Sequence, residues 1–230
     1  MNGTGYVDIF ATKGIEYLLV IGFLMMLIVF ARALLRTPAP LRAAAATGAA
    51  GRGAWFTLAD ERFYHQGHTW AAPEGDDIVR VGLDDFAQKL VGVPERIDLP
   101  RVGQRIEQGE RGLVLSVAAT PIDVLAPVSG QVLAVNEEVL RLPGLLNEDP
   151  YGRGWLLRVR VPRLAANLRN LLAGRLAQHW MEGTVVELRQ RMAGDLGPVL
   201  QDGGLPVSGI ARELAPDQWA SVAREFLLSR

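Results

Sequence analysis

A succession of short apolar segments separated by turn-forming residues runs from Trp55 to Val161, and it restricts the fold more than any other feature of the sequence. The stretches GLVLSVA, QVLAVN and WLLRVRV are rich in aliphatic residues and lie between glycine, proline and asparagine residues. One short helix is predicted in DDFAQKLVG, where an aspartate can cap the first turn and Val93-Pro94 follows the end. Many short strands at this spacing indicate a small barrel or sandwich, so we expect residues 55–162 to form a mainly β domain with some α-helix.

The composition argues against several classes of function. A formal net charge of -1 gives no electrostatic reason to expect nucleic-acid binding. The chain contains no cysteine, which excludes disulfides and thiolate ligands or nucleophiles. His65 and His68 have a spacing that a metal site can use, but no third ligand accompanies them. Because the sequence has no phosphate loop, catalytic triad or carboxylate pair, we expect no enzyme activity, metal, cofactor or small-molecule substrate.

The strongest local signal is the apolar run YLLVIGFLMMLIVFA at residues 17–31, which contains no charged side chain. A membrane span needs roughly 20 residues, and Arg32 and Arg36 can lengthen the run by reaching the interface. Only Lys13 supplies positive charge before the run, so the positive-inside rule keeps the C-terminal side in the cytoplasm. We therefore expect residues 1–36 to form a single-pass transmembrane anchor in the cell inner membrane, with a cleaved signal peptide or a buried helix as the alternatives.

Two further regions complete the predicted organisation. Residues 37–54 are rich in alanine, glycine and proline and predict a linker. Residues 163–230 predict a C-terminal helical extension, whose first helix is expected to end at Gly174 and whose later helices carry apolar stripes at helical spacing. The stripes can pack on the barrel or bind a partner subunit. The side chains predicted to contact a partner are Trp180, Met181, Val185, Leu188, Trp219 and Phe226.

Four segments taken together resemble the H protein of the glycine cleavage system, a lipoyl carrier. The resemblance implies a barrel-sandwich hybrid fold for residues 55–162 and a hairpin whose tip presents a lysine that carries lipoate in amide linkage. The segments follow the order of the family. They are HTWAAPEGDDIVRVGLDDFAQKLVG (68–92), LPRVGQRIEQGE (99–110), DVLAPVSGQVLAVNEEV (123–139) and LLNEDPYGRGWLLRVRV (145–161).

The carrier lysine that the resemblance implies is missing. Counting back from APVSG places the carrier position at Ala119, and a shift of one residue gives Ala118 or Thr120. Forming the amide requires an amine that can lose its proton, which arginine effectively cannot do. The only lysines of the chain are Lys13, beside the apolar run, and Lys89, in the predicted short helix. We expect no attached lipoate, and a hairpin that serves packing through Leu113, Leu115, Val117, Ile122 and Val124.

Two functions of different classes are compatible with these patterns. The first is a non-catalytic structural or assembly subunit of a multi-subunit membrane complex, preferably a redox or respiratory one, whose partners are the lipid bilayer and other protein subunits. The second is a membrane-associated lipoyl-type carrier that serves glycine cleavage or another lipoate-dependent enzyme, which needs a modified lysine. A third reading is a protein that recruits lipoate-processing enzymes by mimicry. The mass of the intact protein separates the first two.

Overall fold

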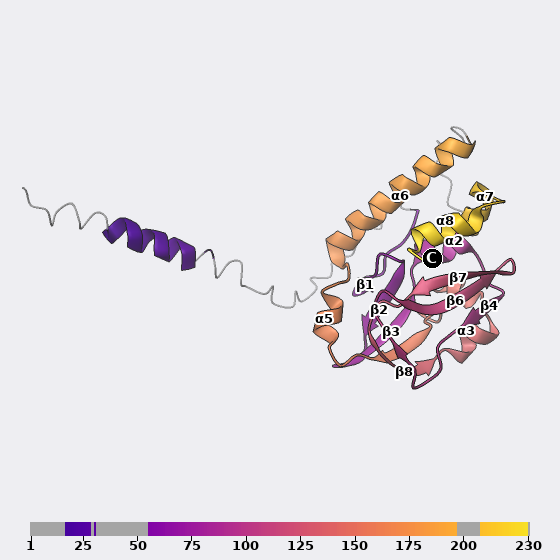
Figure 1. Cartoon of the computed structure of the whole chain (residues 1–230), viewed down its shortest axis with the longest axis horizontal. Helices are drawn as coiled ribbons and strands as arrows, with labels where there is room; N and C mark the ends of the chain where they lie inside the picture. Colours follow the sequence, from indigo (N-terminus) through magenta and orange to yellow (C-terminus); the bar gives the residue numbers. More distant parts are fainter. Residues whose placement is uncertain (1–16, 29, 31–54, 197–207, 230) are drawn as a thin grey trace, which may run out of the picture. The chain divides into compact units, whose positions relative to one another are not determined.

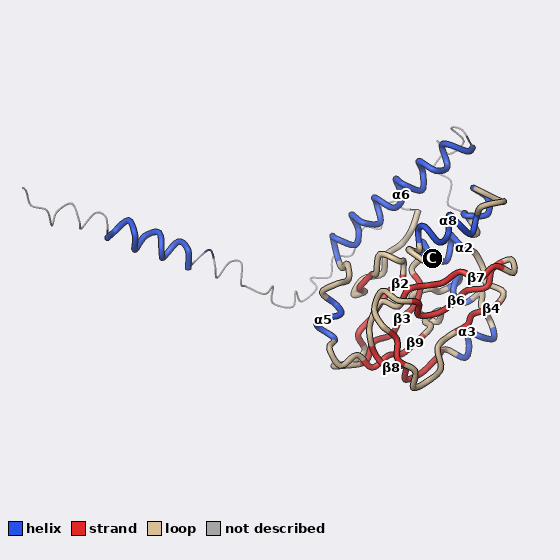
Figure 2. Tube along the Cα trace, in the orientation of Figure 1, coloured by secondary structure: helices blue, strands red, loops and turns tan. Residues whose placement is uncertain are grey.

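The computed structural model describes residues 17–28, 30, 55–196 and 208–229 (Figure 1). The chain divides into two compact units, residues 1–49 and residues 50–230. The larger unit holds strands β1–β9 and helices α2–α8, with the strands gathered together and helices around them (Figure 2).

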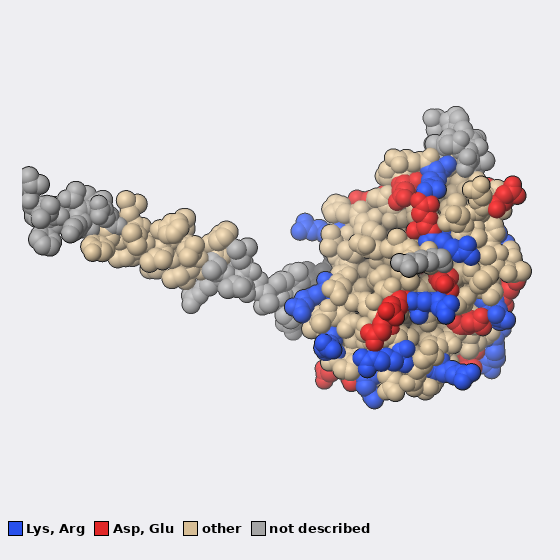
Figure 3. All heavy atoms as spheres, viewed as in Figure 1, with Lys and Arg blue, Asp and Glu red and all other residues tan. Residues whose placement is uncertain are grey.

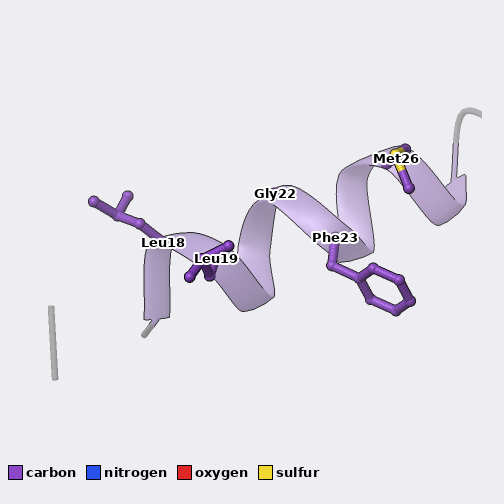
Figure 4. A pocket seen from close by; sticks show the side chains of 5 residues that line it. All are labelled: Leu18, Leu19, Gly22, Phe23 and Met26. Carbon is purple, nitrogen blue, oxygen red and sulfur yellow. The ribbon is translucent and has the colours of Figure 1, made fainter. Parts of the chain in front are cut away.

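In the smaller unit, the described part is a helix at residues 17–28. Its apolar side chains are exposed, and that of Leu19 is 70% exposed. Gly22 leaves a shallow hollow on the helix surface, which Leu18, Leu19, Phe23 and Met26 line (Figure 4). Most of the expected anchor at 1–36 and the whole expected linker at 37–54 lie outside the described residues. Among the residues described, none of the helices combines the length and the hydropathy that a bilayer-spanning segment requires.

Two antiparallel sheets form the larger unit. One has six strands in the order β1-β2-β3-β9-β8-β5, and the other has three strands in the order β4-β6-β7. The expectation of a mainly β domain with helices is therefore confirmed. The strands are β1 Phe63–Tyr64, β2 Thr69–Pro73, β3 Ile78–Leu83, β4 Arg96–Asp98, β5 Arg105–Ile106, β6 Arg111–Val117, β7 Thr120–Leu125, β8 Gly130–Val135 and β9 Leu157–Arg160.

The two sheets share one apolar core. Val81 and Val159 of the larger sheet and Leu115 and Ile122 of the smaller sheet belong to the same cluster, and each is at most 1% exposed. Burial of an aliphatic side chain of this size contributes about 1.5–3 kcal/mol. Gly130 allows β8 to approach β9 closely, because an added Cβ would lie 2.1 Å from a backbone carbonyl oxygen.

Helix α2, at Asp85–Val91, begins and ends as its sequence predicts. The carboxylate of Asp84 accepts a hydrogen bond of 2.8 Å from the backbone N–H of Ala87, which satisfies one free donor of the first turn. Gly92 follows the last turn with a φ of 82°, a conformation that glycine adopts at little cost. The helix turns Phe86 into the core, so its position is fixed by packing as well as by its cap.

Four further helices precede the last part of the chain: α3 Glu137–Arg141, α4 Leu145–Glu148, α5 Leu164–Leu168 and α6 Gly174–Leu196. The prediction that a helix ends at Gly174 is wrong, because α5 ends at Leu168 and Gly174 begins α6. Leu172 lies between them and exchanges two backbone hydrogen bonds of 2.8 Å with Tyr64 of β1. This pairing with a strand overrides the local preference for helix.

The C-terminal helices α7, Ile210–Leu214, and α8, Trp219–Phe226, pack on the rest of the larger unit. Figure 1 shows α8 beside α2 and over β7, and both neighbours contact this pair of helices. The ring of Phe226 lies 5.4 Å from that of Phe86 in α2. Arg191 of α6 forms an ion pair with Glu225, which ties the long helix to α8.

Candidate functional site

The hairpin of β6 and β7 turns at Ala118 and Ala119. Val117 pairs directly with Thr120, so these two residues form the whole connection. Their φ angles are 47° and 60°. A two-residue turn with two positive φ angles is of type I′, which fits the twist of the strands but favours asparagine and glycine. Both alanines are exposed, so the turn presents two methyl groups to solvent at a conformational cost.

Contacts from two other parts of the chain hold this tip. The backbone N–H of Ala119 donates to Glu95 Oε2 at 3.3 Å. Arg224 of α8 donates to the carbonyl oxygen of Pro121 at 3.1 Å. Of the three candidate carrier positions, Thr120 has the polar side chain, and its hydroxyl lies 3.5 Å from the carbonyl oxygen of Ala118. The three candidate carrier positions therefore lie together at the tip, and none of them offers an amine for an amide bond.

The strands beneath the tip pack into the core as their alternation predicts. The side chains that point inward are at most 5% exposed, whereas Arg111 at the start of β6 is exposed. The buried side chains anchor the hairpin by apolar packing, which does not depend on a modified residue at its tip. The predicted packing residues, all confirmed as buried, are Leu113, Leu115, Val117, Ile122 and Val124.

Lys89, the one lysine within the described residues, lies on α2 and is held there. Its Nζ donates to Asp85 Oδ2 at 2.9 Å and to the carbonyl oxygen of Trp55 at 3.3 Å. The ammonium also lies 5.6 Å from the ring centroid of Phe56, a cation–π contact. Its side chain is 27% exposed. Attachment of an acyl group would require this amine to leave all three partners, which makes Lys89 a structural residue in this geometry.

Comparison with known proteins identifies the family. Residues 62–194 match the family model of the glycine cleavage H-protein. The chain belongs to this family. The glycine cleavage system H protein of Thermus thermophilus is 42% identical over 112 residues, which cover 49% of this chain and 86% of that protein. The probable glycine cleavage system H protein of Natronomonas pharaonis is 48% identical over 105 residues, which cover 45% of this chain and 82% of that protein.

One solved structure is also similar to this H-protein family member. The crystal structure of a glycine cleavage system H protein from Mycobacterium marinum has 29% sequence identity and a TM-score of 0.48. The aligned region covers 56% of this chain and 99% of that protein. The family match ends at residue 194, within α6, so α7 and α8 lie beyond it.

Both histidines considered as metal ligands take part in the packing of the H-protein domain. His68 is 2% exposed, and its Nδ1 lies 2.8 Å from Asp84 Oδ2. His65 accepts a hydrogen bond of 3.0 Å at Nδ1 from the backbone N–H of Gly67, and burial lowers the pKa of its imidazole. Within the described part of the chain, no three potential ligands gather in a geometry suited to a metal ion.

Tyr64, which is buried, and Tyr151, which is partly buried, form a polar cluster that the sequence does not predict. The Tyr151 hydroxyl donates to the carbonyl oxygen of Thr57 at 2.7 Å and accepts from the backbone N–H of Asp85 at 3.1 Å. The Tyr64 hydroxyl donates to a backbone carbonyl oxygen at 2.9 Å. Burial raises the pKa of both phenols far above the usual value, so they act as neutral donors. No local pattern marks the cluster, because the Tyr151 hydroxyl joins Thr57 and Asp85, which are far from it in the sequence.

The six side chains predicted to contact a partner lie against the core of this chain. Four of them are at most 9% exposed, and the other two are half-buried and pack on the same core. Of the two alternatives, packing on the barrel is therefore the one that the structure describes, and binding of a partner through these side chains stays a prediction. The four are Met181, Leu188, Trp219 and Phe226, and the two are Trp180 and Val185.

Proposed function

We propose that this member of the H-protein family is a non-catalytic structural subunit that carries no lipoate. It works within a membrane complex of several subunits, for which a redox or respiratory complex is our preferred candidate. The observation that carries the proposal is the tip of the β6–β7 hairpin, where two methyl groups occupy the turn. Acylation of a carrier requires an amine at this position, and neither alanine supplies one.

The retained packing of the hairpin supports a structural role. Its inward side chains join both sheets in one core, so loss of the amine does not remove the reason to keep the strands. The lysine on α2 supports the same view, because its ammonium is engaged by Asp85 and by a backbone carbonyl.

The N-terminal segment supports attachment to a membrane. The described part of the apolar run, residues 17–28, is helical, and its large side chains are exposed. Exposed apolar side chains in such number are unfavourable in water and favourable in the acyl region of a bilayer. We propose that this segment anchors the chain in the cell inner membrane with the H-protein domain in the cytoplasm.

A lipoyl carrier is the second candidate, and the identity to glycine cleavage system H proteins favours it. It requires covalent modification of Lys89 or Lys13, the only two lysines of the chain. The first of these would have to break its ion pair, and the second lies outside the described residues.

Intact-mass spectrometry tests the proposal. The full chain is produced in cells that lipoylate a co-expressed H protein, and an Ala119→Lys variant serves as the positive control for the tip. We expect the unmodified mass for the natural chain and a lipoyl adduct on the variant. A lipoyl adduct on the natural chain overturns the proposal in favour of the carrier.

Extraction in a mild detergent tests the remaining part of the proposal. The full chain should enter the membrane fraction and co-purify with other subunits at fixed stoichiometry. A chain that remains in the supernatant, or a monomer in the extract, contradicts the role as a membrane subunit without affecting the conclusion on lipoate.

A further inference from the structure

The segment between Asp149 and Glu182 contains six arginines and no acidic residue. Three of these arginines are neutralised by carboxylates from elsewhere in the chain. Arg153 pairs with Glu138, Arg158 with Glu74 at 2.8 Å, and Arg160 with Asp77 at 3.5 Å. The other three are Arg163, Arg169 and Arg175, and within the described part of the chain they form no ion pair.

These three arginines lie at the ends of two successive helices. Arg163 and Arg169 flank α5, and Arg175 is in the first turn of α6. All three are exposed, and so is the neighbouring Leu176, at 61%. In Figure 3, basic side chains line the edge of the larger unit where Figure 1 places α5. We call Arg163, Arg169, Arg175 and Leu176 the α5 patch.

Acidic groups near the patch do not cancel its charge. Glu107 is close enough to Arg163 for a weak electrostatic interaction. Its carboxylate, however, accepts a hydrogen bond of 2.9 Å from Arg105. The pKa of Glu107 is lowered chiefly by this hydrogen bond, and Arg163 contributes less. Glu107 and Arg105 therefore neutralise each other, which leaves the three positive charges of the patch.

The backbone that carries the patch is fixed to the barrel. Asn167 of α5 accepts a hydrogen bond of 2.7 Å from the backbone N–H of Ser129, which follows β7. The Gln108 side chain donates to the carbonyl oxygen of Asn167 at 3.0 Å and accepts from Asn170 at 2.8 Å. The arginines that flank α5 thus project from a helix held against the barrel rather than from a free tail.

We propose that the α5 patch binds the phosphate groups of anionic lipids at a membrane surface. The guanidinium group matches phosphate with two parallel hydrogen bonds, and an exposed leucine beside it can enter the interface. An acidic protein would satisfy the charges equally well, but the same chain carries an exposed apolar helix at residues 17–28, and insertion of that helix into a bilayer keeps the basic patch near a lipid surface, where anionic headgroups attract arginine. The proposal deepens the membrane attachment proposed above and is independent of the conclusion on lipoate.

Hydrogen exchange of the full chain on lipid nanodiscs tests the patch. Discs of phosphatidylcholine alone are compared with discs that also contain phosphatidylglycerol. Each arginine near an anionic surface contributes about fivefold in affinity. Three arginines then favour the anionic surface by about a hundredfold, so we expect the amides of residues 163–176 to exchange measurably more slowly on the anionic discs than on the neutral discs, and high salt to remove the difference.

Two triple variants with the same change in net charge make the test specific. Arg163→Gln/Arg169→Gln/Arg175→Gln should lose the slower exchange on anionic discs. The matched control, Arg96→Gln/Arg111→Gln/Arg153→Gln, removes exposed arginines that have acidic partners and should keep it. Equal melting temperatures of the two variants confirm that each is folded.

Each other outcome has a definite meaning. Equal exchange on the two kinds of disc, an unaffected patch variant, or no association with anionic discs overturns the proposal. Protection of residues 163–176 by poly-glutamate but not by anionic discs overturns it in favour of an acidic protein partner. Association with anionic discs alone supports the patch while it contradicts anchoring by the apolar segment, so the two proposals fail in distinguishable ways.

Discussion

The imidazole Nδ1 of His68 lies 2.8 Å from Asp84 Oδ2, and the two side chains are 2% and 0% exposed. The other carboxylate oxygen of Asp84 accepts from the backbone N–H of Ala87 and caps α2. The imidazole ring lies 4.2 Å from the ring of Phe86 and 4.6 Å from that of Trp180. One buried pair therefore joins the strand layer, α2 and α6 of the H-protein domain.

Replacing Asp84 by alanine should lower the free energy of unfolding by about 3–5 kcal/mol, because it leaves a buried histidine without its partner and removes the cap of α2. Urea denaturation followed by tryptophan fluorescence measures the loss. Asp98→Ala is the matched control, since Asp98 is 50% exposed and pairs with Arg96 at the surface. We expect a change below about 1 kcal/mol for the control. Equal losses in the two variants contradict the central role of Asp84.

The features that the sequence predicts correctly depend on local signals. The bounds of α2 require only an aspartate just before the helix and Val93-Pro94 just after it, so both signals are local in the chain. The hairpin of β6 and β7 follows from alternation of apolar residues on either side of a short break. The lack of an amine at the tip also follows from the sequence, because all three possible alignments place a residue other than lysine there.

The features that the sequence does not predict depend on partners far away in the chain. The end of α5 at Leu168 is set by pairing of Leu172 with Tyr64, more than a hundred residues earlier. The apolar stripes of α6 and α8 identify the faces to be buried, but periodicity does not say what covers them. The structure places Leu188 and Phe226 in the core of the same chain.

Ala119→Gly should stabilise the protein by about 0.5–1 kcal/mol. The residue has a φ of 60°, which costs an alanine about 1–2 kcal/mol and a glycine nothing, although glycine adds entropy to the unfolded chain. Ala165→Gly is the control, because it makes the same chemical change inside the helix α5 and should destabilise by about 0.5–1 kcal/mol. Thermal unfolding of the two variants should therefore shift in opposite directions, and shifts of the same sign contradict the type I′ turn.

Phe226→Ala tests whether the C-terminal helices belong to the folded unit. Phe226 is 6% exposed and contacts Phe86, so truncation should cost about 3–5 kcal/mol. Leu228→Ala, two residues later, removes a side chain that is 52% exposed and should cost less than about 0.5 kcal/mol. A single unfolding transition with a large shift only for Phe226→Ala is expected. A small shift for both means that α8 contributes little to the stability of the domain.

His65 gives the stability a definite pH dependence. Burial, with neighbouring His68 as a smaller cause, lowers the pKa of His65 below its ordinary value of about 6.5. Below that pH the unfolded chain binds a proton that the folded chain binds less readily, so stability falls as the pH falls.

His65→Asn removes the titrating group, and the asparagine carbonyl oxygen can still accept the hydrogen bond from Gly67. Urea unfolding is measured at about pH 7.5 and about pH 5.5, a window that includes the ordinary histidine pKa. The natural chain should lose more stability across this window than the variant does. All other groups are the same in the two proteins, so the difference between the two losses isolates His65, and parallel losses contradict the lowered pKa.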